Sequence, residues 1–236
     1  MYNNKLVIDI ENKVTDGNPS PYHKDNYLVC VGHAPITDKV ENVTVTWFKH
    51  DEYKDSSPSD VTDLQNALDK ADLLIGHNIK YDMSWLYECG FTYSGDLYDT
   101  MIGEYLLARG EKLALSLEQS CKRRNVTQKK SELIEEYFSN KVGFEAMPIG
   151  LVGEYNKYDI ISCGELYLEQ DKLYLIQANA MNDSLLLLFK ETIPALDLFA
   201  GPASYHRIIT SSQYQELLNV ITEDYLIVID DNYEII

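Results

Sequence analysis

Four acidic side chains could act together, although they come from three distant segments of the chain. Asp9 and Glu11 lie in LVIDIEN, Asp82 lies in GHNIKYD, and Asp159 lies in NKYDIIS. Carboxylates that folding brings together are the groups that proteins use to hold divalent cations, and such ions can be held against a phosphodiester. These four residues are therefore candidate metal ligands and candidate catalytic groups.

The spacing of two pairs supports this interpretation. Side chains alternate along a strand, so Asp9 and Glu11 would project from the same face, where two carboxylates repel unless a cation lies between them. Tyr155 precedes Asp159 by four residues, which places both on one face of a helix. The bland alternatives remain open, because a strand edge with two acids and a Tyr four residues from an Asp are both common.

The segment around Asp82 leaves similar alternatives. Asp82 should lie early in a helix that follows a buried strand, where its carboxylate can reach the carboxyl edge of the sheet, although the helix dipole also favours an acid in a first turn. Asn78 either caps this helix or binds a substrate oxygen. His77 fits a structural histidine better than a ligand.

The elements that must position these residues follow from hydrophobic patterning. The predicted strands are residues 5–10, 27–34 and 43–50, the last two as antiparallel neighbours of the first, followed by short strands at 73–76 and 96–99. The predicted helices are residues 60–71 with Asp60 as N-cap, 79–89, 101–108, 115–124, 131–138, 150–169 and 172–190. This order predicts an α/β layer architecture, a mixed sheet flanked by helices.

Charge argues against unaided attraction to a nucleic acid. The chain carries 38 acidic and 20 basic side chains, a net charge of −18, which repels a phosphate backbone. Bound metal ions or a local basic patch would offset this repulsion. The alternative to a basic patch is a solvated helix end, where the C-terminal dipole favours cations. The residues of the candidate patch are Lys122, Arg123, Arg124, Lys129 and Lys130.

Nothing in the sequence indicates a membrane protein or a secreted one. The longest apolar run, residues 185–189, is far shorter than the roughly 18 residues that a membrane span needs. The N-terminus lacks a basic region followed by an apolar one, so no signal peptide is expected. We therefore predict a cytoplasmic protein, in the host cytoplasm if it is phage-encoded.

The three acidic segments resemble the Exo I, Exo II and Exo III motifs of the DEDD 3′-5′ exonucleases, which are DnaQ-like and have an RNase H-like fold. The resemblance is strongest to the proofreading domain of family A DNA polymerases, including phage enzymes, and covers about residues 5–190. It includes NIKYD at 78–82, DTM at 99–101 and LSLEQ at 115–119. The histidine subclass places its base five residues before the last Asp, where this chain has Glu154, so the tyrosine subclass is favoured.

The resemblance implies a role for each candidate. Asp9, Glu11 and Asp159 would bind one ion, Asp9 would also contact a second ion that Asp82 holds through water, and Tyr155 would orient the attacking water. Mg²⁺ or Mn²⁺ suits such an all-oxygen site. Asn12 stands where many relatives have Thr and could alter contacts to the terminal nucleotide. The candidate substrate-binding residues are Asn12, Asn78, Lys122, Arg123 and Arg124.

The domain organisation and context follow from the same resemblance. We predict an exonuclease domain at residues 1–190 and a small C-terminal extension at 191–236, with a strand, a helix and a strand at 207–210, 212–221 and 225–229. Family A polymerases continue into thumb, palm and fingers, whereas this sequence ends at Ile236. We therefore expect a free-standing exonuclease, or the proofreading part of a split polymerase with a separate polymerase subunit as partner.

The predicted function is metal-dependent 3′-5′ hydrolysis of single-stranded or frayed DNA ends. One alternative is an RNase D-like 3′-5′ exoribonuclease, although those proteins usually carry a helical nucleic-acid-binding domain downstream. A second alternative is a non-catalytic module that keeps the fold and binds a protein through its negative surface. Neither a GxxxxGK[ST] nor a GxGxxG loop is present, which disfavours nucleotide-triphosphate hydrolysis.

Overall fold

The computed structural model describes the backbone of residues 2–52, 58–108 and 111–190, and the side chains of residues 2–52, 61–108 and 111–173. Residues Tyr2–Lys172 form one compact unit, and a second unit begins at Leu173. The elements predicted between 207 and 229 lie outside the described residues. The predicted domain boundary at residue 190 stays a prediction.

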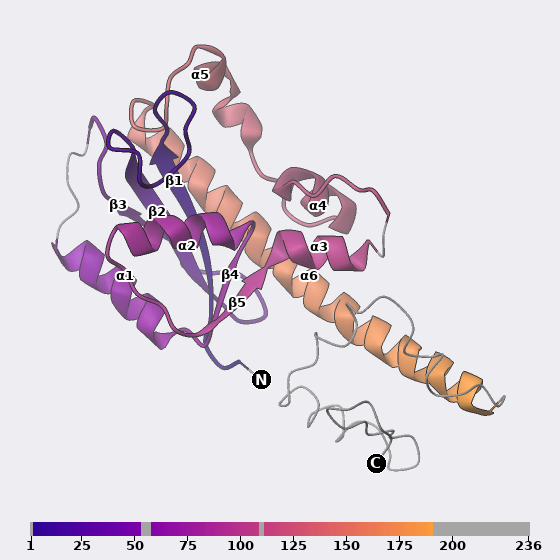
Figure 1. Ribbon diagram of the computed structural model, residues 1–236. Helices are drawn as coiled ribbons and strands as arrows, with labels where there is room; N and C mark the ends of the chain where they lie inside the picture. The colour runs from indigo at the N-terminus through magenta and orange to yellow at the C-terminus, as the bar shows by residue number, and fades with distance from the viewer. Residues whose placement is uncertain (1, 53–57, 109–110, 191–236) are drawn as a thin grey trace. The chain divides into compact units, whose positions relative to one another are not determined.

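A five-stranded mixed sheet forms the centre of the first unit (Figure 1). Its strands lie in the order β3-β2-β1-β4-β5. β1 is antiparallel to β2 and parallel to β4, so the prediction of a mixed sheet is confirmed. The bounds of the strands are β1 Lys5–Lys13, β2 Tyr27–Ile36, β3 Thr44–Trp47, β4 Leu73–Gly76 and β5 Asp96–Asp99.

The position of β3 corrects one expectation. The strand predicted at 43–50 is shorter than expected and pairs with β2, not with β1. Because β2 and β4 take both sides of β1, no hydrogen-bonding edge of β1 is left for a third neighbour.

Helices cover both faces of the sheet (Figure 1). α1 and α2 pack on one face, and the N-terminal part of α6 packs on the other. The bounds of the helices are α1 Pro58–Lys70, α2 Ile79–Glu88, α3 Thr100–Leu107, α4 Leu117–Arg124, α5 Glu135–Ser139 and α6 Ile149–Lys190, with a 3₁₀ turn at Ser131–Leu133. In the part of the chain that the structure describes, no helix is long and apolar enough to cross a membrane.

Three predicted helices differ in extent. α1 begins at Pro58 instead of Asp60, and proline is a common first helical residue. The single helix predicted at 131–138 is split, because the backbone at Ile134 opens to φ −116° and ψ −7°. The two helices predicted at 150–169 and 172–190 are one helix, since residues 169–172 contain no glycine or proline to end it.

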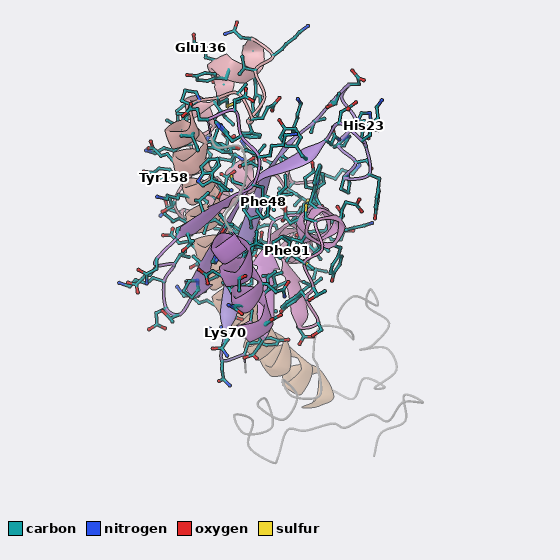
Figure 2. All side chains as sticks on the ribbon, turned by 90° about the vertical axis from the view of Figure 1, so that its left-hand side faces the viewer. His23, Phe48, Lys70, Phe91, Glu136 and Tyr158 are labelled. Atoms are coloured by element: carbon teal, nitrogen blue, oxygen red, sulfur yellow. The ribbon has the colours of Figure 1, made fainter. Side chains whose placement is uncertain are left out.

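Alternation along β1 decides which side chains face which helix layer. Leu6, Ile8 and Ile10 join the core beneath α1 and α2, where Phe48 and Phe91 also meet edge to face with ring centroids 5.8 Å apart (Figure 2). Val7 instead joins the core beneath α6. Asp9 and Glu11 continue the register of Val7, so β1 directs them toward α6.

A buried acid joins three helices. Glu104 of α3 is fully buried and accepts hydrogen bonds from Arg124 Nε at 2.8 Å and from Gln170 Nε2 of α6 at 3.0 Å. Arg123 Nη1 of α4 contacts its other carboxylate oxygen. Burial would raise the pKa of Glu104, but these hydrogen bonds outweigh it and lower the pKa. Two members of the predicted basic patch therefore hold α4 against α3.

Replacing Glu104 by alanine should lower the free energy of unfolding by about 3 kcal/mol, because two arginines lose the buried partner of their charges. Urea unfolding measures this change. Glu41→Ala is the matched control, since Glu41 makes an exposed ion pair with Lys39 and exposed pairs contribute about 1 kcal/mol or less. Equal losses in the two variants would show that the Glu104 pairs do not hold these helices together.

Candidate active site

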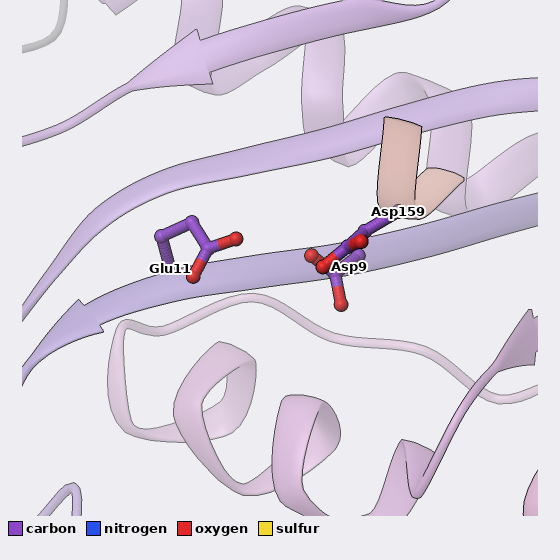
Figure 3. Close-up of side chains that lie close together, drawn as sticks. All are labelled: Asp9, Glu11 and Asp159. Atoms are coloured by element: carbon purple, nitrogen blue, oxygen red, sulfur yellow. The ribbon is translucent and has the colours of Figure 1, made fainter. Parts of the chain in front are cut away.

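Folding brings three of the four predicted acids together. Asp9 and Glu11 come from β1 and Asp159 comes from α6, and one carboxylate oxygen from each lies within 4.8 Å of the other two (Figure 3). Glu11 and Asp159 are buried, and Asp9 is half-buried. The i, i+2 spacing on the strand and the packing of α6 on the same face together produce this carboxylate cluster, by which we mean Asp9, Glu11 and Asp159.

The carboxylate cluster has the electrostatics of a cation site. Burial, and next the charge of Asp159, raise the pKa of Asp9 from its ordinary value of 3.8 to about 8. Burial also raises the pKa of Glu11 and of Asp159. Asp159 Oδ1 is buried without a hydrogen-bond partner among the described residues. A buried set of acceptor-only oxygens with one left unpaired fits a divalent cation that prefers oxygen ligands.

A lysine supplies positive charge to the carboxylate cluster. Lys129 Nζ lies 2.9 Å from Asp159 Oδ2 and 4.8 Å from the centroid of the Tyr155 ring. Burial would lower the pKa of Lys129, but the charges of Asp159, Asp9 and Glu11 outweigh it and raise the pKa. The sequence placed Lys129 in the basic patch but not in the site. Since it is thirty residues from Asp159 along the chain, no local spacing could have paired the two.

Asp82 lies outside the carboxylate cluster, but the charge of the cluster acts on it. Burial, and next the charge of Asp9, raise the pKa of Asp82. Its Oδ2 is buried with no hydrogen-bond partner in the described part of the chain. A Cβ on Gly76 would stand 3.2 Å from this oxygen, so the glycine at the end of β4 allows the close approach. Its contact with a metal ion through water stays a prediction.

The turn before α2 is held differently from the prediction. Asn78 precedes the helix with left-handed backbone angles, φ 64° and ψ 44°, and its side chain makes no capping hydrogen bond. Its backbone N–H donates to Asp99 Oδ1 at 2.9 Å, and the same oxygen accepts from Met101 N at 2.9 Å. Asn78 therefore occupies the N-cap position, as one interpretation expected, but it does not cap the helix with its side chain. His77 Nδ1 hydrogen-bonds to Thr100 Oγ1 at 2.9 Å, which suits a structural histidine.

Tyr155 lies beside the carboxylate cluster as a neutral phenol. It is buried, and burial followed by the charges of Asp159, Glu11 and Asp9 raises its pKa. At neutral pH the phenol keeps its proton, so it can donate and accept hydrogen bonds but does not act as a charged base.

The predicted substrate-binding residues occupy separate places. Asn12 Oδ1 accepts a hydrogen bond of 2.9 Å from Tyr81, which ties the strand carrying Glu11 to the NIKYD segment. Lys122 is exposed, whereas Arg123 and Arg124 pair with Glu104. Contacts of these residues and of Asn78 with a substrate stay predictions.

The sheet is mixed and has the strand order given above. Acids lie on its central strand and on the helix packed against that strand. These features define a nuclease-type α/β fold. The chain belongs to the 3′-5′ exonuclease family of the family A DNA polymerase type, whose model matches residues 35–167, more than half of the 236 residues. Asp82, Tyr155 and Asp159 fall inside the matched segment. Asp9 and Glu11 precede it and join the site through the fold.

A solved structure described as the "apo form of the nuclease" supports the assignment of the fold. It matches with a TM-score of 0.53 and 15% sequence identity, over 75% of this chain and 76% of that chain. The prediction of an RNase H-like exonuclease fold is thereby confirmed. No curated protein matches the sequence. Membership of the family implies a phosphodiester hydrolase that acts on a nucleic acid.

The raised pKa of Asp9 predicts how pH acts on the metal-free protein. Protonated Asp9 contributes stability that is present below about pH 4 and is lost as pH rises toward about 8. In EDTA, the melting temperature should therefore fall more across this range for the wild type than for Asp9→Asn, which carries no charge. At pH 8, Mg²⁺ should raise the melting temperature of the wild type and not that of Asp9→Asn.

Thermal melts of both proteins from pH 4 to 8, each with EDTA and with Mg²⁺, make this comparison. Parallel pH profiles for the two proteins, together with equal effects of Mg²⁺, would show that Asp9 is not destabilised by the cluster.

Proposed function

We propose that this chain is a metal-dependent 3′-5′ exodeoxyribonuclease of the tyrosine subclass, which removes nucleotides from single-stranded or frayed DNA 3′ ends. The observation that carries the proposal is the convergence of Asp9, Glu11 and Asp159 beside Tyr155 in a member of the 3′-5′ exonuclease family. The non-catalytic alternative is disfavoured, because a module without chemistry has no need of three adjacent acids in mutual repulsion, two of them buried.

Two Mg²⁺ or Mn²⁺ ions are the proposed cofactors. Asp9, Glu11 and Asp159 would hold one ion, while Asp9 and, through water, Asp82 would hold the other. When bound, such ions activate a water molecule and stabilise the charge of the leaving 3′ oxygen. Carboxylates with raised pKa values release their protons when a cation binds, so metal binding should strengthen with pH.

The protein itself would orient the reacting groups. The phenol of Tyr155 would accept a hydrogen bond from the attacking water or donate one to it, because its raised pKa keeps it neutral. Lys129 would reduce the mutual repulsion of the carboxylate cluster. Asn12, Asn78 and Lys122 would contact the substrate.

Arg123 and Arg124 would reach phosphates with the N–H groups that Glu104 leaves free. The net charge of −18 favours a polymerase subunit or another partner that supplies further positive surface.

Loss of a ligand or of the phenol should separate the roles. Asp9→Ala and Asp159→Ala should each reduce hydrolysis at least about 10²-fold, because each removes a charge that holds the ions. Tyr155→Phe should cost about 10²-fold through loss of its hydroxyl while the metal still binds. A 5′-labelled oligonucleotide with Mg²⁺, run on a gel beside an EDTA control, should give a ladder of shortened products.

Asp38→Ala is the matched control, since Asp38 is exposed and is not part of the carboxylate cluster. Undiminished activity in both Asp9→Ala and Asp159→Ala would refute the site.

The choice between DNA and RNA needs a direct comparison. Matched DNA and RNA oligonucleotides of the same sequence should show faster removal of 3′ nucleotides from DNA. Faster trimming of RNA would replace this proposal with the RNase D-like alternative while leaving the metal site intact.

A further inference from the structure

A buried amide reaches the carboxylate cluster from the same helix turn that carries Tyr155. Asn156 is fully buried, and its Nδ2 donates to Asp9 Oδ2 at 2.9 Å and, more weakly, to the Asp9 backbone oxygen at 3.4 Å. The backbone oxygen of Asp9 can only accept hydrogen bonds, which suits the nitrogen of the amide facing Asp9. The bond crosses from α6 to the central strand of the sheet.

The strand next to β1 is shaped to receive this amide. Gly32 of β2 lies directly opposite Asp9 in the β1–β2 register. A Cβ at Gly32 would fall on Asn156 Oδ1 and would stand 2.9 Å from Ile160 Cγ1. Only a residue without a side chain leaves room for the amide there, so Gly32 and Ile160 confine Asn156 to its position.

The contact carries a cost that folding alone does not explain. Asn156 Oδ1 is buried and has no hydrogen-bond partner within the described residues, and a buried unpaired acceptor is unfavourable. An apolar residue of similar size would avoid this cost in the same packed space. Of the polar atoms of the Asn156 side chain, Nδ2 has a hydrogen-bond partner, namely Asp9, in the part of the chain that the structure describes.

We propose that Asn156 is a positioning residue that fixes the carboxylate of Asp9 for the metal ions. This inference rests on the proposed function. The charges of Glu11 and Asp159 repel Asp9, and a free carboxylate would rotate away from them. With Oδ2 held by the amide, Asp9 keeps its free lone pairs directed at the cluster before any ion arrives. Groups that orient a metal ligand in this way typically change metal affinity by about 10–100-fold.

The experiment is calorimetric titration with Mn²⁺ in the absence of nucleic acid, with the melting temperature measured separately. Asn156→Ala should weaken Mn²⁺ binding by about 10-fold or more. Ser162→Ala is the matched control, because Ser162 is buried on the same helix and its hydroxyl has no hydrogen-bond partner in the part that the structure describes. It should bind Mn²⁺ as the wild type does.

A second variant tests the confinement. Gly32→Ala displaces the amide and should weaken Mn²⁺ binding to a similar extent, whereas adding it to Asn156→Ala should weaken binding little further, since both act through one contact. If Asn156→Ala unfolds at the assay temperature, Asn156→Ser gives the same comparison, because its side chain is too short to reach Asp9.

The outcomes separate the two proposals. If the wild type binds Mn²⁺ and both Asn156 variants bind it equally well, the positioning role is wrong and the exonuclease proposal stands. If the variants lose only melting temperature, Asn156 is structural and the inference is likewise overturned. If the wild type itself binds no Mn²⁺, the proposed metal site fails first and the inference fails with it.

Discussion

Asp9, Glu11 and Asp159 repel one another where β1 meets α6, and the fold holds them together nonetheless. This repulsion is the constraint on which the rest of the site depends. Together with burial, which has the larger effect, it raises the pKa of Asp9 from 3.8 to about 8. It also brings the ammonium of Lys129 against Asp159, and it gives a divalent cation more to gain from binding than isolated carboxylates would offer.

The surrounding structure can be understood as the support for that arrangement. Two layers of helices cover the sheet on both faces, so the acids of the central strand lie against α6. Glycines at two positions allow side chains to approach the strands closely, Gly32 for Asn156 and Gly76 for Asp82. Glu104 lies outside the carboxylate cluster, where its buried ion pairs join α3 to α4 and its hydrogen bond from Gln170 joins α3 to α6. Three carboxylates that repel one another need such rigid neighbours, because movement of the surrounding helices or strands would let the acids separate.

Local patterning was enough to predict much of this from the sequence. The strands at 73–76 and 96–99 were predicted with the bounds that the structure shows, and spacing of two and of four residues placed Asp9 with Glu11 and Tyr155 with Asp159. What the sequence could not provide depends on long-range partners. The neighbour of β3 depends on which strand edge remains free. The arginines of α4 pair with an acid about twenty residues away. The roles of Lys129 and Asn156 exist only once α6 packs on β1.

A crystal structure of the wild type grown with Mn²⁺, with anomalous data collected at the manganese edge, tests the central claim most directly. The account predicts an anomalous peak at about 2.0–2.3 Å from oxygens of Asp9, Glu11 and Asp159, with Lys129 Nζ withdrawn from Asp159. A structure at saturating Mn²⁺ with no peak between these carboxylates, and with Lys129 still bound to Asp159, would contradict it.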